Sequence, residues 1–157
     1  MQVQFYVLSD AQQQPSTELA APSASGLANV PAHFTLACQL CADLYRAGQR
    51  VLVFCENQQD AELLDEVLWQ FDAERFVPHN LAGEGPQRGA PIEISWQTPK
   101  SSRQVLVNLT ASIPTFANRF VQIIEFVPVA EALKIAAREK YKHYRQLGVT
   151  PETINAS

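Results

Sequence analysis

Four basic side chains and one tyrosine recur near the carboxyl end with the spacing of one helical face. They belong to the stretch PVAEALKIAAREKYKHYRQL, residues 128–147. At about 100° per residue, one arc of about 100° holds Lys134, Arg138, Tyr141, Lys142 and Arg145. Lysine and arginine donate charge-assisted hydrogen bonds to carboxylates, and a tyrosine between them adds apolar contact. The pattern therefore indicates a surface for an anionic partner, although a solvated helix exterior shows the same pattern.

The opposite arc of this helix predicts a face that packs on a core. Its members are mostly apolar, namely Leu133, Ala136, Ala137, Tyr144 and Leu147. Lys140 lies among them, and we expect its ammonium group to reach solvent on its flexible stem.

A glycine-rich segment at residues 83–89, GEGPQRG, could in principle hold a phosphate. Such a loop needs its glycines between a strand and the start of a helix, whose amides bind the anion. Here Pro86 and Pro91 interrupt any helix, a strand candidate follows, and the Lys-Ser/Thr ending of a P-loop is absent. We therefore expect no nucleotide cofactor and interpret the segment as a shaped surface loop.

The remaining reactive residues form no catalytic pattern. Cys38 and Cys41 spell C-x-x-C, but both fall in the middle of a predicted helix, and no second pair completes a zinc site. They are better interpreted as buried small apolar residues. His33, His79 and His143 are scattered without a nucleophile partner. The sequence therefore predicts no catalytic residue, metal site or cofactor.

Three large aromatics lie close together at the end of another predicted helix and in the loop after it. They are Trp69, Phe71 and Phe76. Core filling is the default interpretation, but aromatics clustered in this way also form interaction hot spots.

The length, composition and net charge of the chain indicate a single acidic domain with one locally basic segment. The chain has 157 residues, 46% hydrophobic content and a formal net charge of −4. This length supports one core and is short for two domains. No run approaches the roughly 18 apolar residues of a membrane span, and three cysteines make a disulfide framework improbable, so we expect a soluble cytoplasmic protein. The acidic charge argues against broad nucleic-acid binding, so any anion contact is expected to be focal.

The elements that position these residues alternate between strand and helix patterns. Strand candidates are residues 3–9, 50–56, 92–96, 104–109 and 120–127, and helix candidates are 33–47, 58–70, a short 114–119 and 128–147. Segments 10–32 and 71–91 are expected to be surface loops, and 148–157 a flexible tail. The pattern predicts a single three-layer, Rossmann-like α/β domain over residues 1–157, with about five mostly parallel strands and a C-terminal basic amphipathic helix.

Several long strings resemble the chi subunits of bacterial DNA polymerase III holoenzyme. They are FYVL at 5–8, RAGQRVLVFCE at 46–56, DEVLW at 65–69, FVPHNLAGEGP at 76–86, RGAPIEISW at 88–96 and AREKYKHYR at 137–145. The resemblance covers nearly the whole chain. Segment 10–32 departs from it, because it looks longer than the family's usual first loop, and no function is carried onto it.

The resemblance implies a non-catalytic accessory subunit of the clamp loader, with a Rossmann-like fold that has lost nucleotide binding. It implies two partners: the psi subunit, which connects chi to the clamp loader, and the acidic C-terminal tail of the single-stranded-DNA-binding protein. By resemblance, the psi surface includes Trp69 and Phe76. The tail pocket includes Lys134, Arg138, Tyr141 and Lys142, with Val127 at its apolar floor.

Two alternatives from other classes remain open at this stage. One is a direct single-stranded nucleic-acid binder that uses the same basic helix, and it would show steep salt dependence without any protein tail. The other is a degenerate nucleotide-dependent enzyme, which would bind ATP or NAD.

Overall fold

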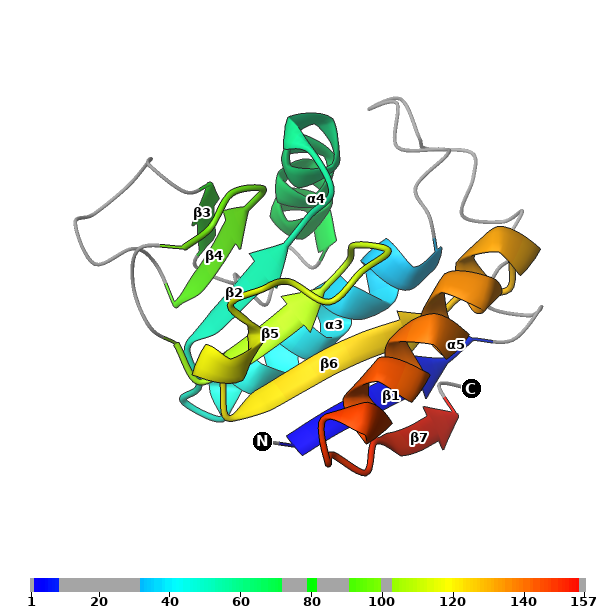
Figure 1. Ribbon diagram of the computed structural model, residues 1–157. Helices are drawn as coiled ribbons and strands as arrows, with labels where there is room; N and C mark the ends of the chain where they lie inside the picture. The colour runs from blue at the N-terminus through cyan, green and yellow to red at the C-terminus, as the bar shows by residue number, and fades with distance from the viewer. Residues whose placement is uncertain (1, 9–31, 72–78, 82–90, 100–102, 156–157) are drawn as a thin grey trace.

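The computed structural model describes residues 2–8, 32–71, 79–81, 91–99 and 103–155, except for the side chains of residues 70, 71 and 80. Figure 1 shows one sheet with helices on both of its faces. The strands are β1 (Gln2–Val7), β2 (Val51–Phe54), β3 (His79–Leu81), β4 (Ile92–Ser95), β5 (Val105–Asn108), β6 (Gln122–Val127) and β7 (Glu152–Asn155). The helices are α3 (Ala32–Arg46), α4 (Gln58–Phe71), the short 3₁₀ helix η3 (Ala117–Arg119) and α5 (Glu131–Gln146).

The sheet has seven strands in the order β3-β4-β2-β5-β6-β1-β7, and every pairing between them is parallel. The predicted single-domain Rossmann-like α/β fold is confirmed, while the expected number of about five strands was too low. Both missed strands are edge strands. Strand β3 is three residues long inside the region expected to be a loop, and β7 lies inside the expected flexible tail.

The expectation of a flexible tail at 148–157 was therefore wrong for residues Glu152–Asn155. Gly148 has φ of +86°, a left-handed conformation that suits glycine, and it ends the turn after α5. The chain then pairs with β1, where Phe5 lies opposite Thr153 and Tyr6 opposite Ile154. Residues 156–157 lie outside the described residues, as do residues 10–31 of the loop expected at 10–32, whose last residue, Ala32, begins α3.

Two cores lie on opposite faces of the sheet, which gives the predicted three layers. The side chains of β2 alternate between these two cores. Val51 and Val53 pack with residues of α3 and α4, whereas Leu52 packs with residues of α5 and η3. In Figure 1, α3 and α4 accordingly lie on the side of the sheet opposite α5.

Strands β1 and β2 are connected through α3, as the strand-helix-strand pattern predicted, and they run parallel in the same sheet. They are not neighbours, because β5 and β6 lie between them. The wide crossover brings the first strand beside the last two, so that β1 pairs with β6 and β7.

Helix α4, expected at residues 58–70, begins after a capping side chain and buries one face. The Asn57 side chain accepts a hydrogen bond from the Asp60 backbone amide at 2.8 Å, which is an N-cap. Ala61 and Leu64 are fully buried. Trp69, for which core filling was the default interpretation, is 55% exposed.

Cys38 and Cys41 are buried apolar residues, as predicted, and Cys55 is buried too. Cys38, Cys41 and Cys55 are fully buried and form no disulfide. Burial raises the pKa of each thiol, that of Cys41 to about 12, so thiolate chemistry is disfavoured. Among the described residues, no helix has both the length and the apolar character to cross a membrane.

Candidate functional site: the basic face of the last helix

Helix α5 runs from Glu131 to Gln146, so it starts three residues later than the sequence suggested. Pro128 and Val129 belong to the turn between β6 and the helix. The N-cap position is Ala130, whose side chain can accept no hydrogen bond. The helix is therefore held by its packing on the sheet rather than by a capping side chain.

The inner face of α5 differs from the expected one. Ala137 and Tyr144 are buried as predicted, but Leu133 is 41% and Leu147 is 59% exposed. Lys140, which was expected to reach solvent, points inward and is 7% exposed. The reason is a partner on the sheet, because its Nζ lies 2.6 Å from Oε1 of Glu125.

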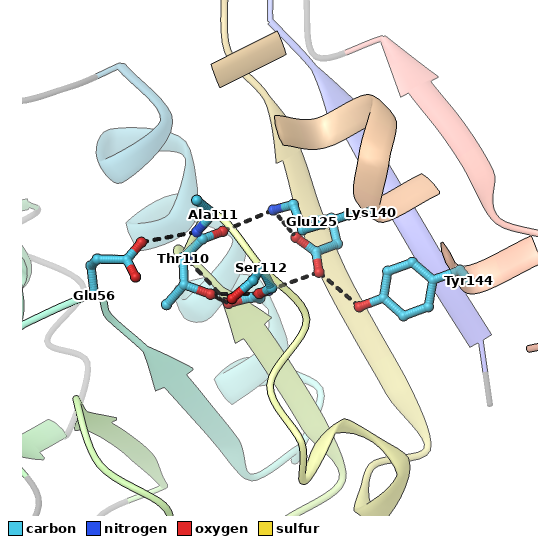
Figure 2. Close-up of polar contacts among 8 residues, drawn as sticks. Glu56, Thr110, Ala111, Ser112, Glu125, Lys140 and Tyr144 are labelled. Atoms are coloured by element: carbon cyan, nitrogen blue, oxygen red, sulfur yellow. Dashed lines mark hydrogen bonds and ion pairs between the residues drawn. The ribbon is translucent and has the colours of Figure 1, made fainter. Parts of the chain in front are cut away.

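Glu125, in the middle of β6, is the centre of a buried polar network (Figure 2). Besides Lys140, it accepts a hydrogen bond from the hydroxyl of Tyr144 at 2.7 Å and one from Nδ2 of Asn108 at 2.8 Å. Lys140 also donates to the carbonyl oxygen of Thr110 at 2.9 Å. Two residues one turn apart on α5 are thus tied to a single carboxylate, which fixes the rotation of the helix about its axis.

Burial raises the pKa of Glu125, and the adjacent Lys140 together with the hydrogen bonds that the carboxylate accepts lowers it. Burial also raises the pKa of Tyr144, and the negative charge of Glu125 adds to this shift, so the hydroxyl stays a donor. The sequence carried two signals for this network that were missed: a single acidic residue within the apolar strand FVQIIEFV, and a lysine within the apolar arc of the helix.

The outer face of α5 presents its cations as the helical wheel predicted. Arg138, Lys142 and Arg145 are exposed, and Lys134 is half-buried. Lys142 lies 3.8 Å from Glu139, and both side chains are about 70% exposed, so this pair contributes little to stability. Within the part of the chain that the structure describes, Lys134, Arg138 and Arg145 form no ion pair.

Tyr141 joins this cationic face to the core. Its ring lies 5.5 Å from that of Phe5 at an interplanar angle of 58°, and the residue is half-buried. Val127, at the end of β6, is half-buried and packs against the same hydrophobic cluster. The structure therefore brings Tyr141 and Val127 to one apolar patch on the side of the sheet that α5 covers.

Only one of the two predicted psi-binding residues lies among the described residues. Trp69 projects near the end of α4, with its ring 4.9 Å from that of His79, while Phe76 lies outside the described residues. His79 is buried, and its Nε2 lies 3.2 Å from Oδ1 of Asp65. Helix α4, which carries Trp69, lies on the opposite face of the sheet from α5 (Figure 1).

The fold and this surface define a single-domain Rossmann-like α/β protein with an exposed cationic face on its last helix. Comparison with known proteins narrows the class. The family described as DNA polymerase III chi subunit, HolC, matches residues 1–152, and the chain belongs to this family. It is thus a replication accessory subunit.

Individual relatives agree with the family. The DNA polymerase III subunit chi of Escherichia coli (strain K12) is 48% identical over 120 residues, which are 75% of this chain and 82% of the relative. That of Haemophilus influenzae (strain ATCC 51907 / DSM 11121 / KW20 / Rd) is 48% identical over 122 residues, 76% of this chain and 85% of the relative. That of Pseudomonas aeruginosa, strain PAO1, is 34% identical over 77% of this chain and 84% of the relative.

Among solved structures, the chain is similar to the crystal structure of T4 UvsW, with a TM-score of 0.57 at 10% sequence identity. The match covers 98% of this chain and 41% of that chain. At this identity the similarity concerns the fold alone. The glycine-rich segment 83–89, which was tested above as a phosphate loop, lies outside the described residues.

Proposed function

We propose that this chain is a non-catalytic adaptor of the polymerase III clamp loader, which binds the psi subunit through one face and the acidic C-terminal tail of the single-stranded-DNA-binding protein through α5. The main support for the tail site comes from the outer face of α5. There, Arg138 is exposed without an ion pair among the described residues, beside the half-buried Tyr141.

A peptide that ends in phenylalanine with a free carboxylate, preceded by aspartates, would match this surface. The planar guanidinium of Arg138 can hold both oxygens of the terminal carboxylate, while Lys134 and Lys142 face the aspartates. The apolar patch of Tyr141 and Val127 would receive the phenylalanine ring. Hydrogen bonds to charged groups contribute about 1.5–3 kcal/mol each, which suggests affinity near micromolar.

The test is a calorimetric titration of the chain with a peptide of the partner's last residues. Arg138→Ala should weaken binding about tenfold or more, because a charge-assisted contact worth about 1.4 kcal/mol or more is lost. Arg46→Ala is the matched control, since Arg46 is a half-exposed arginine at the end of α3 on the other face of the sheet. Equal affinity of Arg138→Ala and Arg46→Ala would contradict the assignment.

The psi surface has a separate test. Trp69 is 55% exposed near the end of α4, so Trp69→Ala should reduce co-purification of psi without unfolding the chain. Recovery of psi at the wild-type yield would remove Trp69 from this surface. Binding of bare single-stranded DNA with a steep salt slope, in the absence of any tail, would instead support a direct nucleic-acid binder.

A further inference from the structure

A cavity of about 240 Å³ opens where the carboxyl ends of three neighbouring strands meet. Glu56 follows β2, Thr110 follows β5, and Phe126 lies near the end of β6, and all three line the cavity. After β2 the chain continues into α4 on one face of the sheet, and after β6 it continues into α5 on the other face. Such a divergence of connections at the carboxyl edge is where α/β sheets bind ligands.

The walls of the cavity are largely apolar and aromatic. Phe34 from the start of α3 and Phe126 from β6 contribute rings, and Leu133 and Ala136 contribute aliphatic surface from α5. Leu133 is 41% exposed, so it forms part of the rim rather than of the core. None of these residues belongs to the outer face of α5 that is proposed above to bind the tail.

The charges that reach the cavity are predominantly negative. Lys140 lines it, but the ammonium group is paired with Glu125 at 2.6 Å. His33 also lines it, and burial, with a further contribution from Lys140, lowers the pKa of its imidazole to about 4, so it is neutral at pH 7. The carboxylates of Glu56 and Asp60 are left without a cationic partner among the ion pairs of the described residues.

The carboxylate of Glu56 and the backbone of Asp60 are held in place. Oε2 of Glu56 accepts a hydrogen bond from the backbone amide of Ala111 at 2.9 Å, which joins it to the loop after β5 (Figure 2). Asp60 is fixed in the first turn of α4, where Asn57 caps the helix. Burial raises the pKa of Asp60, and the charge of Glu56 raises it further. A cation placed in the cavity would relieve this repulsion.

We propose that this cavity binds the side chain of an arginine or lysine on a partner polypeptide, independently of the tail site. The charged end would face Glu56 and Asp60, and the aliphatic stem would lie against Phe34 and Phe126. A polypeptide fits better than a free metabolite, because the exposed Leu133 at the rim offers apolar contact to a residue flanking the inserted side chain.

The test uses the full chain, labelled for amide NMR, and N-acetyl-arginine-methylamide as the probe. The amides of Leu109, Thr110 and Ala111 should shift with a dissociation constant on the order of millimolar. The matched citrulline derivative, which lacks the charge, should bind at least fivefold more weakly. The double variant Glu56→Gln, Asp60→Asn should weaken arginine binding by the same factor while its glutamine still accepts the Ala111 hydrogen bond.

Two further variants test whether the probe binds in the cavity itself or to the surrounding surface. Glu62→Gln, an exposed position on α4, should bind the probe as the wild type does, and Ala136→Leu, which fills the cavity without a charge change, should abolish binding. Equal binding of arginine and citrulline, shifts confined to the outer face of α5, or preferential binding of putrescine would each overturn the proposal. Affinity for the tail peptide should be unchanged in the double variant, so failure here and failure of the tail site are distinguishable.

Discussion

Lys140 and Lys142 are two positions apart on one helix and have opposite environments. Lys142 is about 70% exposed, whereas Lys140 is 7% exposed and is bound to Glu125. Helical periodicity predicted the outward direction of Lys142 correctly. It also placed Lys140 in the apolar arc, but the sequence could not name its partner, because Glu125 lies on a different element and meets Lys140 only in the folded sheet.

Removal of the Lys140 ammonium should be costly because it leaves a buried carboxylate without its counter-charge. We expect Lys140→Met to lower the free energy of unfolding by about 3–5 kcal/mol, measured by urea denaturation. Lys142→Met is the control and should change it by less than about 0.5 kcal/mol. If both variants were equally stable, the buried ion pair would not contribute as described. Adding Glu125→Gln to Lys140→Met should recover part of the loss, because the buried charge is then absent.

His33 should make the stability of the fold depend on pH. Its imidazole is in edge contact with Phe34, and burial lowers its pKa from 6.5 to about 4. The unfolded chain therefore binds a proton more readily than the folded chain. The contribution of His33 to folding stability is full above about pH 6.5, and it is lost as pH falls toward 4. This one group changes the free energy of unfolding by about 1.4 kcal/mol per pH unit, and by about 3 kcal/mol in total.

The measurement compares the wild type with His33→Phe, which keeps an aromatic ring but cannot titrate. Other groups titrate in both proteins, so the difference between their unfolding free energies isolates His33. The unfolding free energy of the wild type minus that of the variant should fall by about 3 kcal/mol between pH 7 and pH 4. A difference that stays constant over this range would show that His33 does not titrate as its burial requires.

At the scale of elements, the sequence predicted the central strands and the helices well, because long apolar runs and helical periodicity determine them. The 50–56 candidate contains β2 (Val51–Phe54), and the 104–109 candidate contains β5 (Val105–Asn108). The edge strands β3 and β7 were missed for a physical reason. Both are short, and their backbone pairs on one side only, so they need few apolar side chains and leave a weak pattern.

We expect the edge strand β7 to stabilise β1 and to protect its backbone amides from hydrogen exchange. A chain that ends at Thr150 lacks β7 and leaves the backbone of β1 unpaired along one side. We expect a loss of about 1–3 kcal/mol in the free energy of unfolding. Amide exchange should also accelerate at Phe5 and Val7. A chain that lacks only residues 156–157 serves as the control, and unchanged exchange in the longer truncation would contradict the role given to β7.

At the scale of the whole molecule, the proposed tail and psi surfaces lie on opposite faces of one sheet. α5 packs on one core and α4 on the other, and the central strands β2 and β5 separate them. The sequence predicted these layers because it alternates strand and helix. It did not predict the cavity at the carboxyl edge, which is assembled from side chains of several separate elements.

The two surfaces should therefore act without coupling. We expect saturation of the chain with psi to change its affinity for the tail peptide by less than about twofold, because binding sites that share no residues usually add independently. In the double variant, Trp69→Ala should weaken psi binding and Arg138→Ala should weaken tail binding, each by the same amount as in the single variant. Calorimetric titration of the tail peptide into the chain alone and into the psi complex measures this directly, and a tenfold difference would require a conformational link between the faces.

The pairing of β1 with β6 and β7 has a consequence for synthesis of the protein. Strand β1 leaves the ribosome before both of its neighbours, and it can pair with them only after residues 122–155 have followed it. Contacts between such distant parts of a chain form slowly, because a long loop must close before they give any stability. The helix proposed to recognise the tail rests on this half of the sheet, so a nascent or prematurely ended chain would offer its partner no ordered surface.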